Sequence, residues 1–257
     1  MTPLDSRLYA VVQAQPYPLL FASLSGAHLY GFASPNSDFD LRGVHLLPVE
    51  KVVGLESAEE TLEISEKRDD LDLDLVTHDA KKYFNMLLKK NGYVLEQLYS
   101  PLSLHTTPAQ EELKAIARTC ITRHHAHHYF GFAATEWKLL NKQETWHIKP
   151  LLYVYRVLLT GIHLMETGEV EANLSRLNHT YPQAHIPDLI ARKTSGAEHD
   201  TLPDVDKEFH EKAYRRLIAQ LERAFEASKL PETPAGREAL NDLLVRLRIK
   251  GLEKSAD

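Results

Sequence analysis

The sequence predicts an α+β fold in which a small mixed β-sheet with flanking helices is followed by an all-helical domain. Segments with the apolar runs or the alternation typical of β-strands lie only in the first third of the chain. Beyond residue 110, apolar residues recur at helical spacing almost to the end. A proline-bounded segment at 101–108 separates these regions, so we expect one domain at 1–105 and a second at 106–257.

The composition is that of an ordinary globular protein. The chain has 257 residues, a net charge of −6, 43% hydrophobic and 26% charged residues. Its single cysteine, Cys120, excludes an internal disulfide and a zinc site built from cysteines. There is no signal-peptide pattern and no apolar run long enough to cross a membrane, so we expect a cytoplasmic protein with no membrane partner. The first 75 residues carry 13 acidic and 5 basic side chains, so negative charge concentrates in the predicted sheet.

The predicted elements follow the chain in a simple order. A short helix is expected within 5–18, and strands at 19–25 and 39–47. Residues 61–67 and 70–78 alternate as the two strands of a hairpin, with 67–69 as its turn. Helices are expected at 80–90, 94–99, 111–139, 146–166, 209–230 and 237–252, with a surface loop at 173–188. Asp79 is placed to cap the helix at 80–90.

Two carboxylates in the second predicted strand indicate the chemistry. Asp38 and Asp40 are two residues apart, so in a strand they project from the same face. At that separation they repel each other unless a divalent cation binds between them. Gly26 and Gly31 precede them and allow the backbone conformations with which a turn approaches a phosphate. The pattern predicts a metal-dependent site for phosphoryl or nucleotidyl transfer.

The second strand of the predicted hairpin offers a third carboxylate. Asp70, Asp72 and Asp74 share one face of that strand, opposite three leucines. A two-metal site needs such a carboxylate from a neighbouring strand. The residues alone leave Asp72 and Asp74 open for this role, beside the alternative of an exposed acidic face.

Two runs around these residues resemble a known family. Ser25-Gly-Ala-His-Leu-Tyr-Gly31 and Ser37-Asp-Phe-Asp-Leu-Arg-Gly43 are similar to the signature of the DNA polymerase β-like nucleotidyltransferases. Within that superfamily, they look like the branch described as the RNA repair pathway polymerase β family. Segment 74–83 and the Lys-x-Asn-x-x-x-Leu-Glu-x-Leu pattern at 89–98 are also similar to it. The family usually has serine where this chain has Ala27.

The resemblance implies a nucleotidyltransferase-type catalytic domain at 1–105 and a helical substrate- and nucleotide-binding domain at 106–257. It implies that Asp38, Asp40 and Asp74 are catalytic and hold two Mg²⁺ ions, for which Mn²⁺ can substitute. The substrate would be a nucleoside triphosphate such as ATP, and the acceptor an RNA 3′ end, with RNA-repair proteins as partners. The expected nucleotide-binding residues are Ser25, Gly26, Ala27, His28, Tyr30, Arg42, Lys149, Tyr153 and Arg156.

Some of these assignments have alternatives. Lys149, Tyr153 and Arg156 share one face of an apolar helix, where the resemblance assigns the cations to phosphate and the tyrosine to base stacking. They could instead extend to solvent at the domain edge. Lys193 is a second phosphate candidate. The histidines in 124–128 suit either a metal site or a polar face that contacts RNA.

Other functions also stay open. The acceptor could be a protein side chain or a small molecule, in a toxin–antitoxin or defence role in which the helical half binds a partner. Because Ala27 lacks the hydroxyl of the family's serine, a non-catalytic nucleotide-binding module is a further alternative. A metal-dependent hydrolase is less favoured, since a glycine turn before the acids suits a bound triphosphate better than a water nucleophile.

Overall fold

The computed structural model describes residues 5–55, 58–68, 71–195, 201–203 and 205–251. The chain forms two compact units: unit 1 comprises Met1–Gly26, Asp38–Cys120 and Pro234–Asp257, and unit 2 comprises Ala27–Ser37 and Ile121–Thr233. The predicted α+β class is confirmed, because unit 1 contains the mixed sheet and unit 2 is mainly helical. The units do not coincide with 1–105 and 106–257, because each contains segments from both halves of the chain. The functional division at residue 105 stays a prediction.

Unit 1 is built on a five-stranded sheet with the order β3-β4-β2-β1-β5. The strands are β1 (Leu19–Leu24), β2 (Phe39–His45), β3 (Thr61–Arg68), β4 (Leu71–Asp79) and β5 (Ser103–His105). β2 and β4 run parallel, and the other neighbouring pairs are antiparallel. The predicted hairpin is β3 and β4; residues 69 and 70 of its predicted turn and second strand lie outside the described residues.

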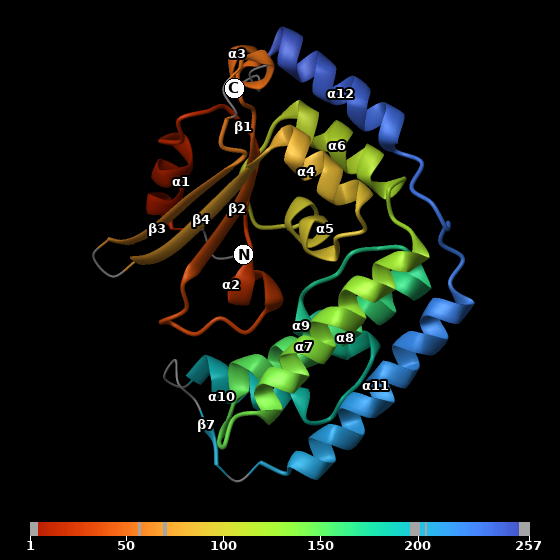
Figure 1. The fold of residues 1–257 in the computed structure, drawn as a ribbon. Coiled ribbons are helices and arrows are strands. Elements are labelled where there is room, and N and C mark those ends of the chain that lie inside the picture. Colours follow the sequence, from red (N-terminus) through yellow and green to blue (C-terminus); the bar gives the residue numbers. More distant parts are fainter. Residues whose placement is uncertain (1–4, 56–57, 69–70, 196–200, 204, 252–257) are drawn as a thin grey trace. The chain divides into compact units, whose positions relative to one another are not determined.

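Helices cover both faces of this sheet (Figure 1). They are α1 (Ser6–Gln13), α4 (Ala80–Leu88), α5 (Gly92–Leu98), α6 (Pro108–Arg118) and α12 (Arg237–Lys250), with the short α3 (Val49–Val53) after β2. On one face, α1 packs on a core of sheet leucines that includes Leu41 and Leu73. On the other, Ser23 donates a hydrogen bond to the carbonyl of Gln97 in α5. The alternation of each strand therefore assigns its residues to one of two cores.

A buried ion pair ties the C-terminal helix to the sheet. Asp79, at the end of β4, is 1% exposed and accepts from the backbone N–H groups of Leu47 and Lys81 at 3.1 and 3.0 Å. The Nη2 atom of Arg248, in α12, lies 2.6 Å from both carboxylate oxygens of Asp79, and its Nη1 donates to the carbonyl of Leu47. The predicted cap of α4 is thus also the anchor of α12.

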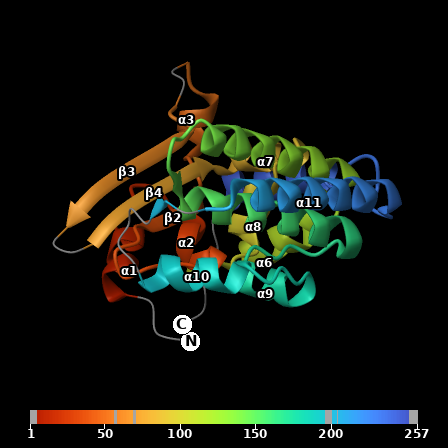
Figure 2. The ribbon, with the colours of Figure 1, turned by 90° about the horizontal axis from the view of Figure 1, so that it is seen from below.

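Unit 2 surrounds one buried helix, α8 (Ile148–Thr167), which corresponds to the apolar helix predicted at 146–166. The remaining elements of this unit are η1 (Arg123–His125), α7 (Ala126–Asn141), α9 (Leu174–Thr180), α10 (Ile186–Ser195), α11 (Lys207–Ala227) and the strand pair β6 (Trp146–His147) and β7 (Thr201–Leu202). α7, α9, α10 and α11 all contact α8 (Figures 1 and 2). Of the helices that the structure describes, none has the length and apolar character to cross a bilayer.

Helix α2 (Gly26–Tyr30) begins at the last residue of one unit and continues in the other. Residues 27–37 therefore pack with the helices of unit 2, although the strands before and after them belong to the sheet. Sequence periodicity does not reveal this exchange, because it depends on contacts with residues more than 100 positions away.

Two predicted elements are corrected. The single helix expected at 111–139 is two helices, α6 and α7, because the chain leaves the helix after Arg118 and Thr122 then begins η1 with a capping box to His125. The surface loop expected at 173–188 contains α9 and the start of α10. Asn173 makes α9 a helix by accepting from the N–H groups of Ser175 and Arg176.

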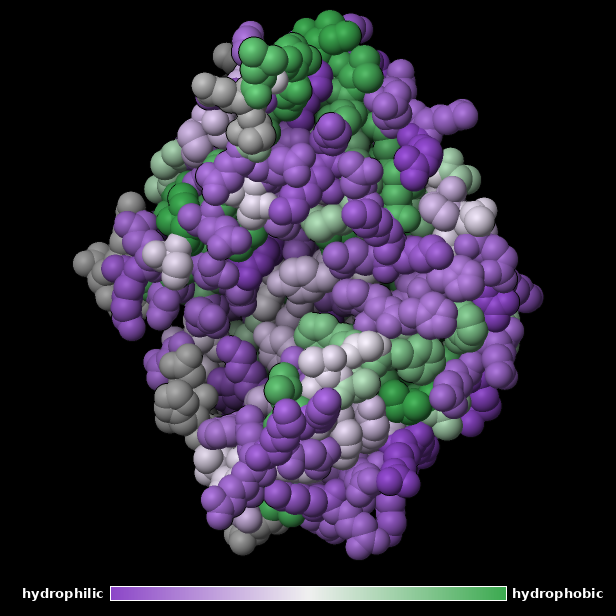
Figure 3. Space-filling model, in the orientation of Figure 1, coloured by the Kyte–Doolittle hydropathy of each residue, from purple (hydrophilic) through white to green (hydrophobic). Residues whose placement is uncertain are grey.

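Apolar side chains gather on the surface over α3 and the C-terminal end of α12 (Figure 3). Val53 and Leu55 are exposed at the end of α3, and Ile249 is exposed in α12. Because α3 follows the C-terminal end of β2, this patch lies at the end of the sheet away from Asp40. It is therefore not part of the acidic site.

We expect Arg248→Ala to lower the free energy of unfolding by about 3–5 kcal/mol, because Asp79 keeps a buried charge without its ionic partner. Arg246→Ala is the matched control, since Arg246 lies on the same helix but pairs with exposed Glu112 and Asp242. It should have a much smaller effect. Urea denaturation compares the two, and equal losses would show that the Asp79 pair is not an anchor.

Stability should also fall as the solution becomes acidic. Burial, with a contribution from nearby positive charge, lowers the pKa of His45 and of His78 to about 4. In the unfolded chain both titrate at about 6.5, so between about pH 6.5 and 4 the unfolded state binds more protons and the free energy of unfolding decreases. His45→Gln should lose less stability than the wild type between about pH 7 and 5 in urea denaturation. An identical decrease in both proteins would contradict this origin.

Candidate active site

The two strands that carry the acidic residues are parallel neighbours. Their register pairs Asp40 of β2 with Asp74 of β4. Leu41 and Leu73 point into the core beneath α1, so Asp40 and Asp74 point to the opposite face. The sheet alone therefore places the two carboxylates side by side.

The register separates the two candidates for the third carboxylate. Asp74 is paired with Asp40, whereas Asp72 is exposed and forms a 3.6 Å ion pair with Lys67. Asp72 and Lys67 are 58% and 76% exposed, so this pair is a solvated surface contact. Asp74 is thus the carboxylate adjacent to Asp40, and its catalytic role stays a prediction.

Gly26 makes room for the Asp40 carboxylate. Its φ of +58° is the left-handed conformation that other residues rarely adopt. A Cβ atom at this position would lie 1.8 Å from Oδ2 of Asp40, and the neighbouring Ser25 N–H donates to the Asp40 carbonyl at 2.8 Å. The turn after β1 and the acid on β2 are therefore closely packed.

Arg42 occupies the space between the paired carboxylates. Its Nη2 atom lies 2.8 Å from Oδ1 of Asp40 and 2.9 Å from Oδ2 of Asp74. Its Nη1 atom donates to the backbone carbonyls of Leu41 and Asp74, each at 2.8 Å. One guanidinium, 12% exposed, thus supplies the positive charge that this pair requires.

Tyr93 of α5 is a further neighbour of Arg42. Burial alone would lower the pKa of Arg42, yet that pKa is raised, because the hydrogen bond and attraction to Tyr93 and the charges of the two aspartates outweigh burial. Sequence reasoning missed Tyr93. The local feature that could have drawn attention to it is Asn91, which caps α5: its side-chain oxygen accepts from the Tyr93 N–H.

Asp38 lies before the first residue of β2 and is half-buried. The rule that placed it on the same face as Asp40 applies only within a strand. Across the described residues, no group of three or more His, Cys, Asp or Glu side chains is arranged to hold a metal ion. The oxygen donors of Asp40 and Asp74 suit Mg²⁺ chemically, but Asp38 is not grouped with them in this arrangement.

The turn that leads into Asp38 is held by hydrogen bonds within unit 2. The Ser37 N–H donates to the Ser34 carbonyl at 3.0 Å, and the Ser34 N–H donates to the Ser37 hydroxyl at 3.0 Å. Lys193 lies in α10 and is 2% exposed; its ammonium group donates a hydrogen bond to Ser34 Oγ at 3.1 Å. The second phosphate candidate therefore contacts the segment directly before the acids.

Three of the predicted nucleotide-binding residues meet in unit 2. The guanidinium carbon of Arg156 lies 3.8 Å from the centroid of the Tyr30 ring and 5.8 Å from that of Tyr153. The two tyrosine rings contact edge to face at 5.5 Å. Arg156 is 1% exposed, so this cation–π contact fixes it within the unit.

The other predicted residues are divided between the units. Ser25 is fully buried, and its hydroxyl has no hydrogen-bond partner in the described part of the chain. Ala27 is also buried, at the start of α2, while His28 and Lys149 are half-buried in unit 2. The nucleotide-binding roles of all of these residues stay predictions.

The histidines at 124–128 form structural contacts. His124 Nε2 lies 2.6 Å from Oε2 of Glu232, and its ring stacks on His127. His125 is buried and accepts from the Thr122 N–H at 3.1 Å. No metal-binding group of three ligands forms here among the described side chains.

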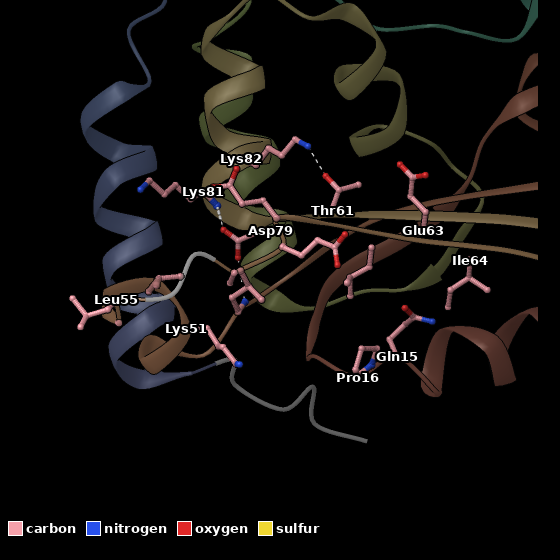
Figure 4. Close-up of a pocket in the computed structure, with 17 residues that line it drawn as sticks. Gln15, Pro16, Lys51, Leu55, Thr61, Glu63, Ile64, Asp79, Lys81 and Lys82 are labelled. Atoms are coloured by element: carbon pink, nitrogen blue, oxygen red, sulfur yellow. Dashed lines mark hydrogen bonds between the residues drawn. The ribbon is translucent and has the colours of Figure 1, made fainter.

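A cavity of about 1000 Å³ lies elsewhere in unit 1, between α3, β3 and the start of α4 (Figure 4). Its lining mixes Lys51, Lys81 and Lys82 with three glutamates, and Lys82 donates to the Thr61 hydroxyl. Asp38, Asp40 and Asp74 do not line it. The candidate active site is therefore separate from this cavity.

Comparisons with known proteins give a consistent assignment. A family model described as the RNA repair pathway DNA polymerase beta family matches residues 2–246. The uncharacterized protein MJ0002 of Methanocaldococcus jannaschii is 35% identical over 159 residues. The alignment covers 61% of this chain and 64% of that protein, just under two thirds of its length. The uncharacterized protein YcgL of Bacillus subtilis is 24% identical over 255 residues, 96% of this chain and 94% of that protein.

Among solved structures, a nucleotidyltransferase-like protein from Exiguobacterium sibiricum is 12% identical, with a TM-score of 0.33 over 95% of this chain and 74% of that one. That similarity is too low to support a conclusion. The family match is different, because it spans the glycine turn, the paired acids, Arg42 and the helical unit. The chain belongs to the RNA repair pathway DNA polymerase beta family.

Proposed function

We propose that this protein is a metal-dependent nucleotidyltransferase that transfers a nucleoside monophosphate from a triphosphate to an acceptor hydroxyl and releases pyrophosphate. Membership of a polymerase β-like family supports a transferase. The observation that carries the proposal is the in-register pairing of Asp40 with Asp74 on one face of the sheet. Carboxylates fixed on neighbouring strands are what such a transfer requires from a protein.

In this proposal Asp38, Asp40 and Asp74 hold two Mg²⁺ ions, which Mn²⁺ can replace. When bound, the ions neutralise the triphosphate and acidify the attacking hydroxyl. We assign Asp40, whose carboxylate packs against Gly26, to the triphosphate. We assign Asp74 to the acceptor hydroxyl, which it would orient and deprotonate.

In this proposal, backbone N–H groups at Gly26 and Ala27 bind the nucleotide. One group of side chains binds its phosphates, and a second group stacks on its base. Ser25, His28 and Arg42 serve the phosphates, with Lys149 and Arg156. Tyr30 and Tyr153 serve the base by stacking. Arg156 contacts both tyrosine rings, which supports a shared role for these three residues.

The acceptor in this proposal is an RNA 3′ end, encountered in the cytoplasm together with RNA-repair proteins. The description of the family supports this choice, and the free thiol of Cys120 agrees with a reducing compartment. Ala27 favours a second candidate, a nucleotide-binding module without catalysis, because it lacks the hydroxyl usual in the family.

The test is incubation with each α-labelled nucleoside triphosphate, Mg²⁺ or Mn²⁺, and RNAs with different ends. Label on the RNA 3′ end would support the proposal and reveal the nucleotide preference. Label on protein would instead identify a side-chain acceptor, as in a toxin–antitoxin or defence role. Nucleotide binding without any transfer or pyrophosphate release would favour the non-catalytic module.

Asp40→Asn and Asp74→Asn should each lower kcat for transfer by about 100- to 1000-fold, because each removes charge that acts on the transition state. Asp72→Asn is the matched control, from the same face of β4, and should retain activity. Initial rates of pyrophosphate release measure all three. Loss in Asp72→Asn with activity retained in Asp74→Asn would move the third carboxylate to position 72.

Gly26→Ala should lower kcat by about 100-fold while the protein stays folded, because the new methyl group displaces the Asp40 carboxylate. Gly131→Ala is the control, since a Cβ atom there meets nothing within 4 Å. Circular dichroism checks the fold of both variants. Full activity in Gly26→Ala would show that Asp40 need not occupy its observed position.

A further inference from the structure

We propose that Arg42 is a built-in counter-cation that competes with the divalent metal ion for the Asp40–Asp74 pair. Metal loading would then require its Nη2 atom to leave the carboxylates while Nη1 stays bound to the backbone. This inference rests on the proposed function, because it concerns the same carboxylates.

The competition follows from where Nη2 lies. This single nitrogen is 2.8 Å from Asp40 and 2.9 Å from Asp74, so it occupies the space that a cation bridging both carboxylates would fill. Two positive charges at that spacing repel each other strongly in a partly buried site.

Arg42 need not leave the site when the metal binds. Its Nη1 atom donates to the carbonyls of Leu41 and Asp74, which are neutral backbone groups fixed by the sheet. A guanidinium held by these partners keeps its charge beside the carboxylates, and its released Nη2 becomes available to a phosphate oxygen.

If Arg42 competes with the metal ion, removing it should lower the stability of the metal-free protein and raise its affinity for the metal. Without the guanidinium, Asp40 and Asp74 repel each other across the two strands, so the metal-free protein becomes less stable. For the same reason the pair binds a divalent cation more tightly. An arginine that only contacted nucleotide would leave metal affinity in the absence of nucleotide unchanged.

The experiment is calorimetric titration of the full chain with Mn²⁺ and no nucleotide. The dissociation constant should fall by about tenfold or more in Arg42→Gln, since a neighbouring opposite charge changes the proton affinity of a carboxylate by about 1–3 logarithmic units. Arg7→Gln is the control, because Arg7 pairs with exposed Asp5 and should leave the constant unchanged. In thermal unfolding, metal-free Arg42→Gln should melt below the wild type, and Mn²⁺ should stabilise it more.

Unchanged or weaker Mn²⁺ binding in Arg42→Gln, with binding by the wild type that Asp40→Asn abolishes, would overturn the competition and leave the proposed function intact. Absence of Mn²⁺ binding in every variant would refute both. Should Arg42→Gln fail to fold, side-chain nitrogen NMR of the wild type provides the test. Mg²⁺ should shift the Arg42 Nη2 signal and speed rotation of that group, and an unaffected signal would overturn the proposal.

Discussion

The parallel alignment of β2 with β4 is the constraint on which the candidate site depends. It sets Asp40 and Asp74 at the same level on neighbouring strands, where two negative charges cannot stay uncompensated at low cost. The leucines of both strands fix the face, because a slip of one residue would turn both acids into the core beneath α1. The hydrophobic pattern that builds the core thus also aims the acidic side chains.

Other features of unit 1 hold these two strands in place. Gly26 fits against the Asp40 carboxylate at the entrance to β2, and at the far ends His45 and Asp79 are buried. Arg248 then joins the end of β4 to the C-terminal helix. Arg42, on the same strand as Asp40, offsets part of the negative charge of the acidic pair.

The sequence predicts those parts of the site that depend on local pattern. Strand alternation indicates the face of Asp74, and the position of Asp79 before an amphipathic helix predicts its cap. The bridge made by Arg42 could not be foreseen, because it requires knowing that β2 and β4 pair in parallel and in which register. Tyr93 and the packing of 27–37 with distant helices were missed because each depends on contacts between segments far apart in the sequence. Asp38 precedes the first residue of β2, so the same-face rule for strands does not decide its direction and its role stays a prediction.

The measurement that tests the central claim most directly is anomalous diffraction at the manganese edge from crystals grown with Mn²⁺ and a non-hydrolysable nucleoside triphosphate. The account predicts a manganese peak about 2.1 Å from carboxylate oxygens of both Asp40 and Asp74. It also predicts that Arg42 Nη2 has left the pair while Nη1 keeps its backbone carbonyls. Manganese bound elsewhere, with Arg42 still bridging the two carboxylates, would contradict it.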